Sequence, residues 1–122
     1  MDSKVFQAVF DMIVEFIPEN WKKIIFTAMY SKGSYSMKFY YHDGDKYMDC
    51  FSIPGVQKLS LVKTFMEIDK VLAKNSGNDK ERWTVFTMIV DEAGNMKTEF
   101  EYEDHTEDMI RYEQEWQKKY LK

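Results

Sequence analysis

The chain has 122 residues, of which 44% are hydrophobic, 16% aromatic and 31% charged. That length supports one domain with a single core, and that composition excludes a disordered chain. The net charge of −4 hides an asymmetry, because residues 91–115 hold ten acidic and two basic residues while the remainder holds 11 acidic and 15 basic. Negative charge concentrated in one segment favours a basic protein partner and argues against binding to nucleic acid or an anionic membrane.

The cysteine content and the distribution of apolar residues indicate a reducing compartment. Cys50 is the single cysteine, which excludes an intramolecular disulfide. The first residues lack a basic segment followed by an apolar run and small residues, so no signal peptide is predicted. No apolar stretch approaches the length of a membrane span. We therefore expect a cytoplasmic protein.

The N-terminal segment predicts a helix over residues 3–17, with Asp2 or Ser3 as its N-cap. Pro18 disfavours helical geometry at Ile17 and should end this helix. The apolar face is wide, as expected of a helix that packs on a sheet. Its members are Val5, Phe6, Val9, Phe10, Ile13, Phe16 and Ile17.

Three strands are predicted next, over residues 21–30, 35–42 and 46–53. The second alternates aromatic and apolar residues with polar ones, and the Asp43-Gly44 pair predicts a tight hairpin before the third. A second helix begins with Ser60 as a candidate N-cap and is followed by a polar loop over residues 75–79. Its predicted buried stripe consists of Leu61, Phe65, Ile68 and Leu72.

A second hairpin joins residues 82–90 to residues 96–104. The first of these strands carries large apolar residues on both faces, which predicts a strand covered on both sides, whereas its half-acidic partner is expected nearer an edge. Thr106 is the candidate N-cap of a last helix, whose apolar stripe is Met109, Tyr112, Trp116 and Tyr120. The predicted order αβββαββα is that of a single α+β domain, residues 1–122, with an antiparallel sheet covered by helices.

The acidic end of the last predicted strand is the main candidate site. Glu99, Glu101 and Glu103 would point to one face at a spacing of about 6.5–7 Å, close to the roughly 6–7 Å between successive phosphates of a nucleic acid. Such a row suits the basic groove of a nucleic-acid-binding protein. A solvated edge strand that discourages edge-to-edge pairing explains the same pattern. The predicted partner-binding residues are Glu99, Glu101, Tyr102, Glu103, Asp104, Glu107 and Asp108.

Residues with catalytic or metal-binding potential are sparse. His42 and His105 each stand beside turn acids, a pattern more typical of surface histidines than of a catalytic site. Cys50 is expected to be a small buried residue on a strand. The chain has no glycine-rich phosphate loop, and its basic residues form no stripe with aromatics. We predict no catalytic residue, no cofactor and no metal site.

Several aromatic and acidic segments are spread along the chain: Phe39-Tyr40-Tyr41 with a glycine turn and Tyr47, Trp83 at the start of a strand, Phe100 to Asp104, Trp116, and Lys119-Tyr120-Leu121. Together these segments resemble the YezG-like (EsaG-like) antitoxin family across nearly the whole chain. The resemblance implies a cytoplasmic immunity protein of a Gram-positive bacterium. Its partner would be the C-terminal nuclease domain of a secreted toxin, including toxins exported by type VII secretion. This implication favours the partner-binding interpretation of the acidic row.

A second hypothesis is a small-molecule-binding or enzymatic α+β domain. Its motivation is the excess of methionine and aromatic residues, which often line apolar pockets. Such a pocket needs a convergent polar group inside the sheet, and Asp49 and Thr27 are the obvious candidates. The sequence is compatible with a monomer or a weak homodimer.

Overall fold

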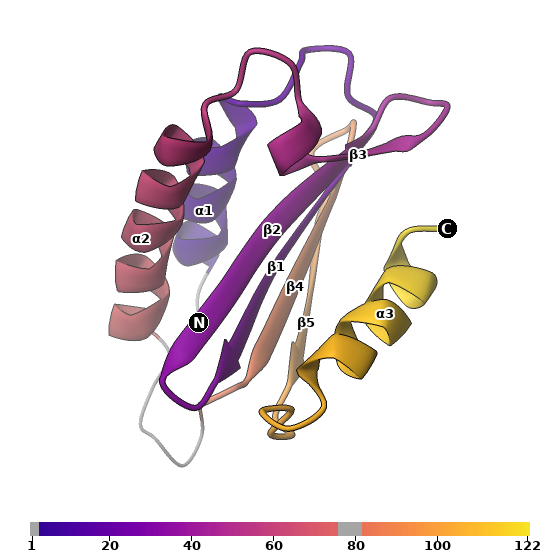
Figure 1. Cartoon of the computed structure of the whole chain (residues 1–122). Helices are drawn as coiled ribbons and strands as arrows, with labels where there is room; N and C mark the ends of the chain where they lie inside the picture. Colours follow the sequence, from indigo (N-terminus) through magenta and orange to yellow (C-terminus); the bar gives the residue numbers. More distant parts are fainter. Residues whose placement is uncertain (1–2, 76–81) are drawn as a thin grey trace.

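In the computed structural model, residues 3–75 and 82–122 are described and form one α+β domain (Figure 1). The helices and strands follow the predicted order αβββαββα, so the expected fold class is confirmed. The elements are α1 (Ser3–Val14), β1 (Lys23–Ser31), β2 (Ser34–His42), β3 (Tyr47–Asp49), a 3₁₀ turn η1 (Cys50–Ser52), α2 (Lys58–Asn75), β4 (Val85–Asp91), β5 (Met96–Glu101) and α3 (Met109–Tyr120).

The strands form one antiparallel sheet in the order β3-β2-β1-β4-β5. The strand β1 lies in the centre, with Thr27 paired to Lys38 of β2 and to Thr87 of β4. The β1–β2 turn contains Gly33 at φ +77°, a conformation that other residues adopt only with strain. The strand β5 is at the edge of the sheet, as its acidic half predicted.

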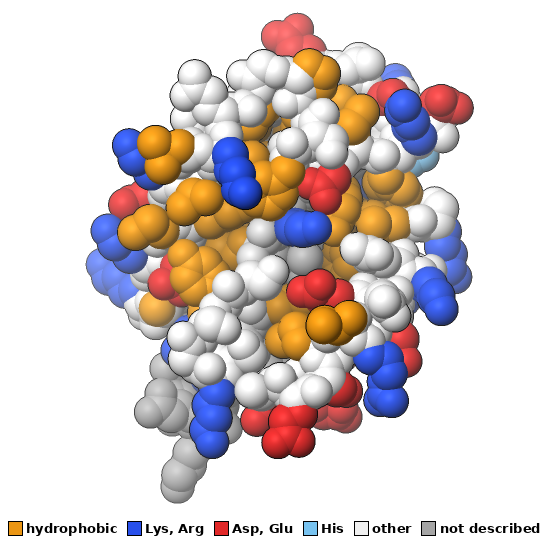
Figure 2. All heavy atoms as spheres, viewed as in Figure 1, with side chains coloured by type: hydrophobic (Ala, Val, Ile, Leu, Met, Phe, Trp, Pro, Cys, Tyr) orange, Lys and Arg blue, Asp and Glu red, His pale blue; other side chains and the backbone are white. Residues whose placement is uncertain are grey.

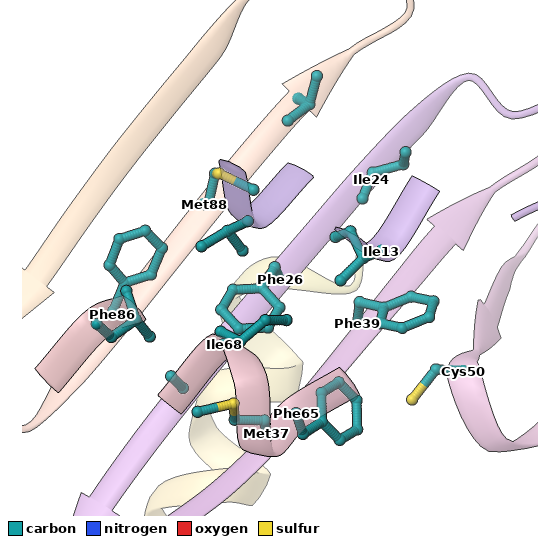
Figure 3. Close-up of a cluster of buried hydrophobic side chains, with 14 of the residues drawn as sticks. Ile13, Ile24, Phe26, Met37, Phe39, Cys50, Phe65, Ile68, Phe86 and Met88 are labelled. Atoms are coloured by element: carbon teal, nitrogen blue, oxygen red, sulfur yellow. The ribbon is translucent and has the colours of Figure 1, made fainter. Parts of the chain in front are cut away.

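One face of the sheet is covered by α1 and α2, and Figure 1 shows these two helices side by side against it. Because side chains alternate along a strand, every second residue of β1, β2 and β4 points into this layer. Figure 3 shows the result, with Phe26, Phe39 and Phe86 packed beneath Ile13 and Ile68. All five side chains are fully buried, so this layer is the main hydrophobic core.

The opposite face is covered by α3 (Figure 1). This second core is smaller and more polar than the first. Tyr40 packs against Trp116, whose indole Nε1 donates a hydrogen bond of 3.0 Å to the hydroxyl of Thr87. Val85 and Ile89 of β4 also contact this cluster, while Phe86, Met88 and Val90 face the main core. The prediction that this strand is covered on both faces is therefore confirmed.

The first helix ends at Val14, earlier than the predicted end at residue 17. The chain tightens there, since the amides of Phe16 and Ile17 each donate to a carbonyl three residues earlier at 3.1 Å. Pro18 follows this tight turn, so the helix has already stopped when the proline is reached. The predicted N-cap Asp2 lies outside the described residues, and Ser3 is the first residue of the helix.

The second helix begins at Lys58, two residues before the predicted N-cap Ser60. The predicted polar loop 75–79 lies outside the described residues except for Asn75, which ends the helix. The stripe itself is confirmed, because its four members are all buried against the sheet. They are Leu61, Phe65, Ile68 and Leu72.

The third strand is shorter than the predicted range 46–53. It ends at Asp49, whose carboxylate accepts a hydrogen bond of 2.7 Å from the amide of Phe51 and so caps η1. Cys50 is consequently in the 3₁₀ turn and not on a strand, although it is fully buried as expected. Burial raises the pKa of its thiol to about 12, which leaves it unreactive near neutral pH.

Two leucines at the start of α2 test this assignment of faces. Leu61 is fully buried and Leu59 is 64% exposed. We expect Leu61→Ala to lower the free energy of unfolding by about 2–5 kcal/mol, through lost burial and the cavity it leaves. Leu59→Ala should stay within ~0.5 kcal/mol, since its side chain is already in solvent. Urea denaturation of both variants measures the contrast, and equal losses would contradict the assigned orientation of α2.

Candidate functional site

The acidic row lies at the edge of the sheet, on the face that α3 covers. Met96 and Phe100 of β5 pack against the main core, so the alternate residues Lys97, Glu99 and Glu101 face the other way. Glu99 and Glu101 occupy that second face, and hydrogen bonds join both to α3. Glu103 is not part of the row, because β5 ends at Glu101 and not at residue 104 as predicted. The sheet therefore aligns two carboxylates, not three.

Two tyrosines of α3 bind these carboxylates. The Tyr112 hydroxyl donates to Glu101 and the Tyr120 hydroxyl donates to Glu99. The hydrogen bond from Tyr120 is the largest cause of a lowered pKa at Glu99, and the charges of Lys119 and Lys97 lower it further. Burial, followed by the hydrogen bond to a carboxylate, raises the pKa of each tyrosine. Glu99 and Glu101 thus fasten α3 to the edge strand.

The connection from β5 to α3 is held by a second group of polar contacts. The Asp104 carboxylate accepts hydrogen bonds from the Thr106 amide at 2.9 Å and from its hydroxyl at 2.5 Å, and these lower the pKa of Asp104. The same hydroxyl accepts from the Lys32 amide at 3.1 Å, which joins the connection to the β1–β2 turn. The segment is therefore tied at several points to the rest of the fold.

His105 is buried, with 8% of its surface exposed, so the expectation of a surface histidine was wrong. Its ring stacks on Tyr112 at 3.9 Å between centroids, and its Nδ1 lies 3.3 Å from the Asp108 carboxylate. Thr106 is not the N-cap of the last helix, since α3 begins at Met109 and Asp108 occupies the N-cap position. The Asp108 carboxylate makes no capping hydrogen bond and contacts His105 and Arg111 instead.

Exposed apolar and acidic side chains lie in this connection and in the first turn of α3. Tyr102 is 63% exposed and Ile110 is 78% exposed, while Glu103 and Glu107 carry exposed carboxylates. Ile110 lines an open hollow of about 490 Å³ at the start of α3, together with Glu107 and Asp108. Ile110 was not among the residues predicted to bind a partner. It could have been recognised from the sequence as an isoleucine that lies off the apolar stripe of its helix, in a segment dominated by acids.

The family model "Immunity protein YezG-like" matches residues 3–122. The chain belongs to this family of immunity proteins. The match spans nearly the whole chain and confirms the resemblance drawn from its aromatic and acidic segments. A search of curated proteins returned no match. Membership supports an immunity role and implies a protein toxin as partner.

The structure also bears on the small-molecule hypothesis. Thr27 is buried with its hydroxyl unpaired, and it lines a space of about 20 Å³ between the sheet and α3. Such a space has room for a water molecule and is far below the roughly 300–1,000 Å³ of ligand pockets. Asp49 is partly exposed, and its carboxylate lies 3.3 Å from the Lys38 ammonium. Thr27 therefore borders a space too small for a ligand, and Asp49 is paired with Lys38 and does not line that space.

Two further properties concern metals and membranes. Within residues 3–75 and 82–122, no group of three or more histidine, cysteine, aspartate or glutamate residues is arranged to hold a metal ion. The polar side chains of the predicted 43–44 turn are engaged by the turn's own backbone. His42 Nδ1 accepts a hydrogen bond of 3.0 Å from the Gly44 amide, and the Asp43 carboxylate accepts from the amides of Asp45 and Lys46. In the same described part of the chain, no helix has the length and apolar character needed to cross a membrane.

The Tyr120–Glu99 hydrogen bond predicts a pH-dependent contribution to stability. The pKa of Glu99 is lowered from 4.5 in the folded state, so the contribution is complete above pH 4.5 and is lost as pH falls through the depressed pKa. Tyr120→Phe removes this hydrogen bond and should lower the free energy of unfolding by about 1 kcal/mol at pH 7. The loss is modest because the Glu99 carboxylate is partly exposed to water. The difference from wild type should shrink below pH 4.5.

The control is Tyr102→Phe, which removes a hydroxyl from an exposed ring. Denaturation of the three proteins from pH 7 to pH 3 measures the effect. A loss for Tyr102→Phe equal to that for Tyr120→Phe, or a Tyr120→Phe loss independent of pH, would contradict the role assigned to the Glu99 hydrogen bond.

Proposed function

We propose that the protein binds and neutralises the C-terminal nuclease domain of a cognate secreted toxin through an acidic face. This face consists of Glu99, Glu101, Tyr102, Glu103, Asp104, Glu107, Asp108 and Ile110. The observation that carries the proposal is the exposed pair Tyr102 and Ile110 among acids, in a chain that belongs to an immunity protein family. Neutralisation would protect the producing cell while the toxin is still in the cytoplasm.

Charge gives the acidic face its fit to a nuclease. A nuclease binds phosphates with a basic surface, and the segment 91–115 of this chain concentrates ten acids against two basic residues. Complementary charge speeds encounter by about ten- to a thousandfold at low salt and suppresses binding to other partners. Glu103 and Glu107 are the exposed acids that would act in this way.

Affinity would come from the two apolar side chains. Large side chains at the centre of an interface commonly carry most of the binding energy, and charged residues around them exclude other partners. Tyr102 and Ile110 have this character, since each is exposed beside acids. Binding to the toxin would remove both from water.

Three acids, Glu99, Glu101 and Asp104, would make the acidic face rigid. Their carboxylates are engaged by Tyr120, Tyr112 and Thr106, so they hold the acidic face in one arrangement before binding. A preorganised surface loses less conformational entropy when it binds. The acids of this face thus form two groups. Glu99, Glu101 and Asp104 position the surface, and Glu103 and Glu107 would contact the partner.

The direct test is titration of the protein into the nuclease domain encoded beside its gene, with cleavage of DNA and RNA measured. We expect cleavage to be abolished near an equimolar ratio, because a stable complex inhibits stoichiometrically. An unrelated basic nuclease provides the control, since a merely acidic protein would inhibit both at low salt. Full activity of the neighbouring nuclease at excess protein would contradict the proposal.

Charge reversal separates the exposed acids from the acids that hold α3. The double variant Glu103→Lys and Glu107→Lys should slow association with the nuclease domain by at least about tenfold at low salt. The matched control is Glu15→Lys with Glu19→Lys, which changes the net charge equally at two exposed positions near the end of α1. Stopped-flow or surface plasmon resonance gives the rates. Equal slowing in both variants would show a net-charge effect and contradict a localised acidic face.

A further inference from the structure

A second exposed apolar surface lies on α2, on the other side of the sheet. Leu59, Val62 and Met66 are 64%, 40% and 51% exposed, and their spacing of three and four residues places them on one side of the helix. Phe51 of η1, 42% exposed, packs on Phe65 of α2 at 6.2 Å between ring centroids. We name Phe51, Leu59, Val62 and Met66 the α2 stripe. Figure 2 shows apolar side chains and lysines gathered over this helix.

The fold does not require the α2 stripe. The helix α2 already buries a complete stripe against the sheet, and these apolar side chains lie on its outer side. Single exposed apolar residues are ordinary, but a contiguous patch of the order of a few hundred Å² is characteristic of an interaction site. Phe51 also borders an open hollow of about 380 Å³ with Val56 and Lys58, so the patch has a concave end.

Positive charge accompanies the stripe. Helical spacing places Lys63, Lys70 and Lys74 along one flank, and Lys58 stands on the other. The nearby acids are engaged within the protein. Glu67 lies 3.2 Å from the Lys70 ammonium, and the Asp69 carboxylate accepts a hydrogen bond of 2.6 Å from the Tyr30 hydroxyl. Lys70 is therefore paired with Glu67, whereas Lys58, Lys63 and Lys74 have no acidic partner among the described residues. The surface offers apolar contact beside these three lysines.

We propose that the α2 stripe binds an amphipathic helix of a protein partner, one with an apolar face and acidic residues along its flank. Leu59 and Met66 are two helical turns apart, about 10 Å, and such a ridge packs well against a second helix. Acidic residues of the partner would pair with Lys58 and Lys63. This partner segment is opposite in charge to the basic nuclease surface that fits the acidic face.

A second copy of this chain fits the surface less well. In a pair of α2 helices with the two-fold axis perpendicular to them, the Lys63 flanks of both copies would lie on the same side. With the axis parallel to the helices, the Lys63 flank of one copy would lie beside the Lys58 flank of the other, so lysines would repel in either arrangement. Because α2 and α3 lie on opposite faces of the sheet, a helix on the α2 stripe leaves the acidic face free (Figure 1).

The test uses two synthetic helical peptides with the same leucine stripe, one flanked by glutamates and the other by lysines. Fluorescence anisotropy should show salt-sensitive binding of the glutamate peptide alone. Met66→Gln should weaken it about tenfold, since an apolar anchor is lost. Lys58→Glu with Lys63→Glu should weaken it at least as much. The control reversal Lys118→Glu with Lys122→Glu, at exposed positions of the C-terminal segment, should leave binding unchanged.

Three results would overturn the proposal. The first is absence of binding by the glutamate peptide, or equal binding of both peptides. The second is a concentration-dependent dimer in sedimentation that Met66→Gln abolishes, which would assign the stripe to a second copy. The third is loss of nuclease neutralisation in Met66→Gln, which would make the stripe part of the toxin-binding surface. Retained neutralisation with weakened peptide binding is the expected outcome.

Discussion

Burial of both faces of the central strands is the constraint on which the rest of the structure depends. Ile24, Phe26 and Ala28 of β1 face one side and Ile25 and Met29 face the other, and all are buried. A strand with two apolar faces needs a covering layer on each side. The first layer is provided by α1 and α2, so α3 must be held against the second face.

The two helical layers are held in different ways. The α1–α2 layer rests mainly on aliphatic and aromatic packing, although Asp69 of α2 accepts a hydrogen bond from Tyr30 of β1. By contrast, α3 donates hydrogen bonds from Trp116, Tyr112 and Tyr120 to side chains of the sheet. Hydrogen bonding satisfies the partly buried carboxylates of β5, and it fixes where the acidic segment leaves the sheet. The arrangement of the proposed acidic face is thus a consequence of how the second face of the sheet is covered.

Periodicity predicted the features that depend on burial. The buried stripe of α2, the two covered faces of β4 and the edge position of β5 all follow from the spacing of apolar residues. The end of β5 did not follow, because alternation continues past Glu101 while the partner strand begins at Val85, opposite Glu101. A strand can pair only as far as its neighbour extends, and that limit is absent from a local pattern.

The acidic segment also contains contacts that a sequence pattern does not specify. The burial of His105 depends on its stacking on Tyr112, seven residues later across a turn. The engagement of Glu99 depends on Tyr120, which lies 21 residues later in the helix that packs on the same face of the sheet. Charge and alternation therefore suggested the candidate surface, while its division into acids that hold α3 and acids that face solvent required the tertiary structure.

Hydrogen–deuterium exchange of the protein, alone and mixed with the nuclease domain of its proposed toxin partner, tests the central claim most directly. Exchange reports which backbone amides gain protection when the toxin covers a surface. We predict that protection is concentrated in residues 101–114, at the end of β5 and the start of α3, and that exchange in α2 is unchanged. Protection confined to α1 or α2, with exchange in residues 101–114 unaltered, would contradict it.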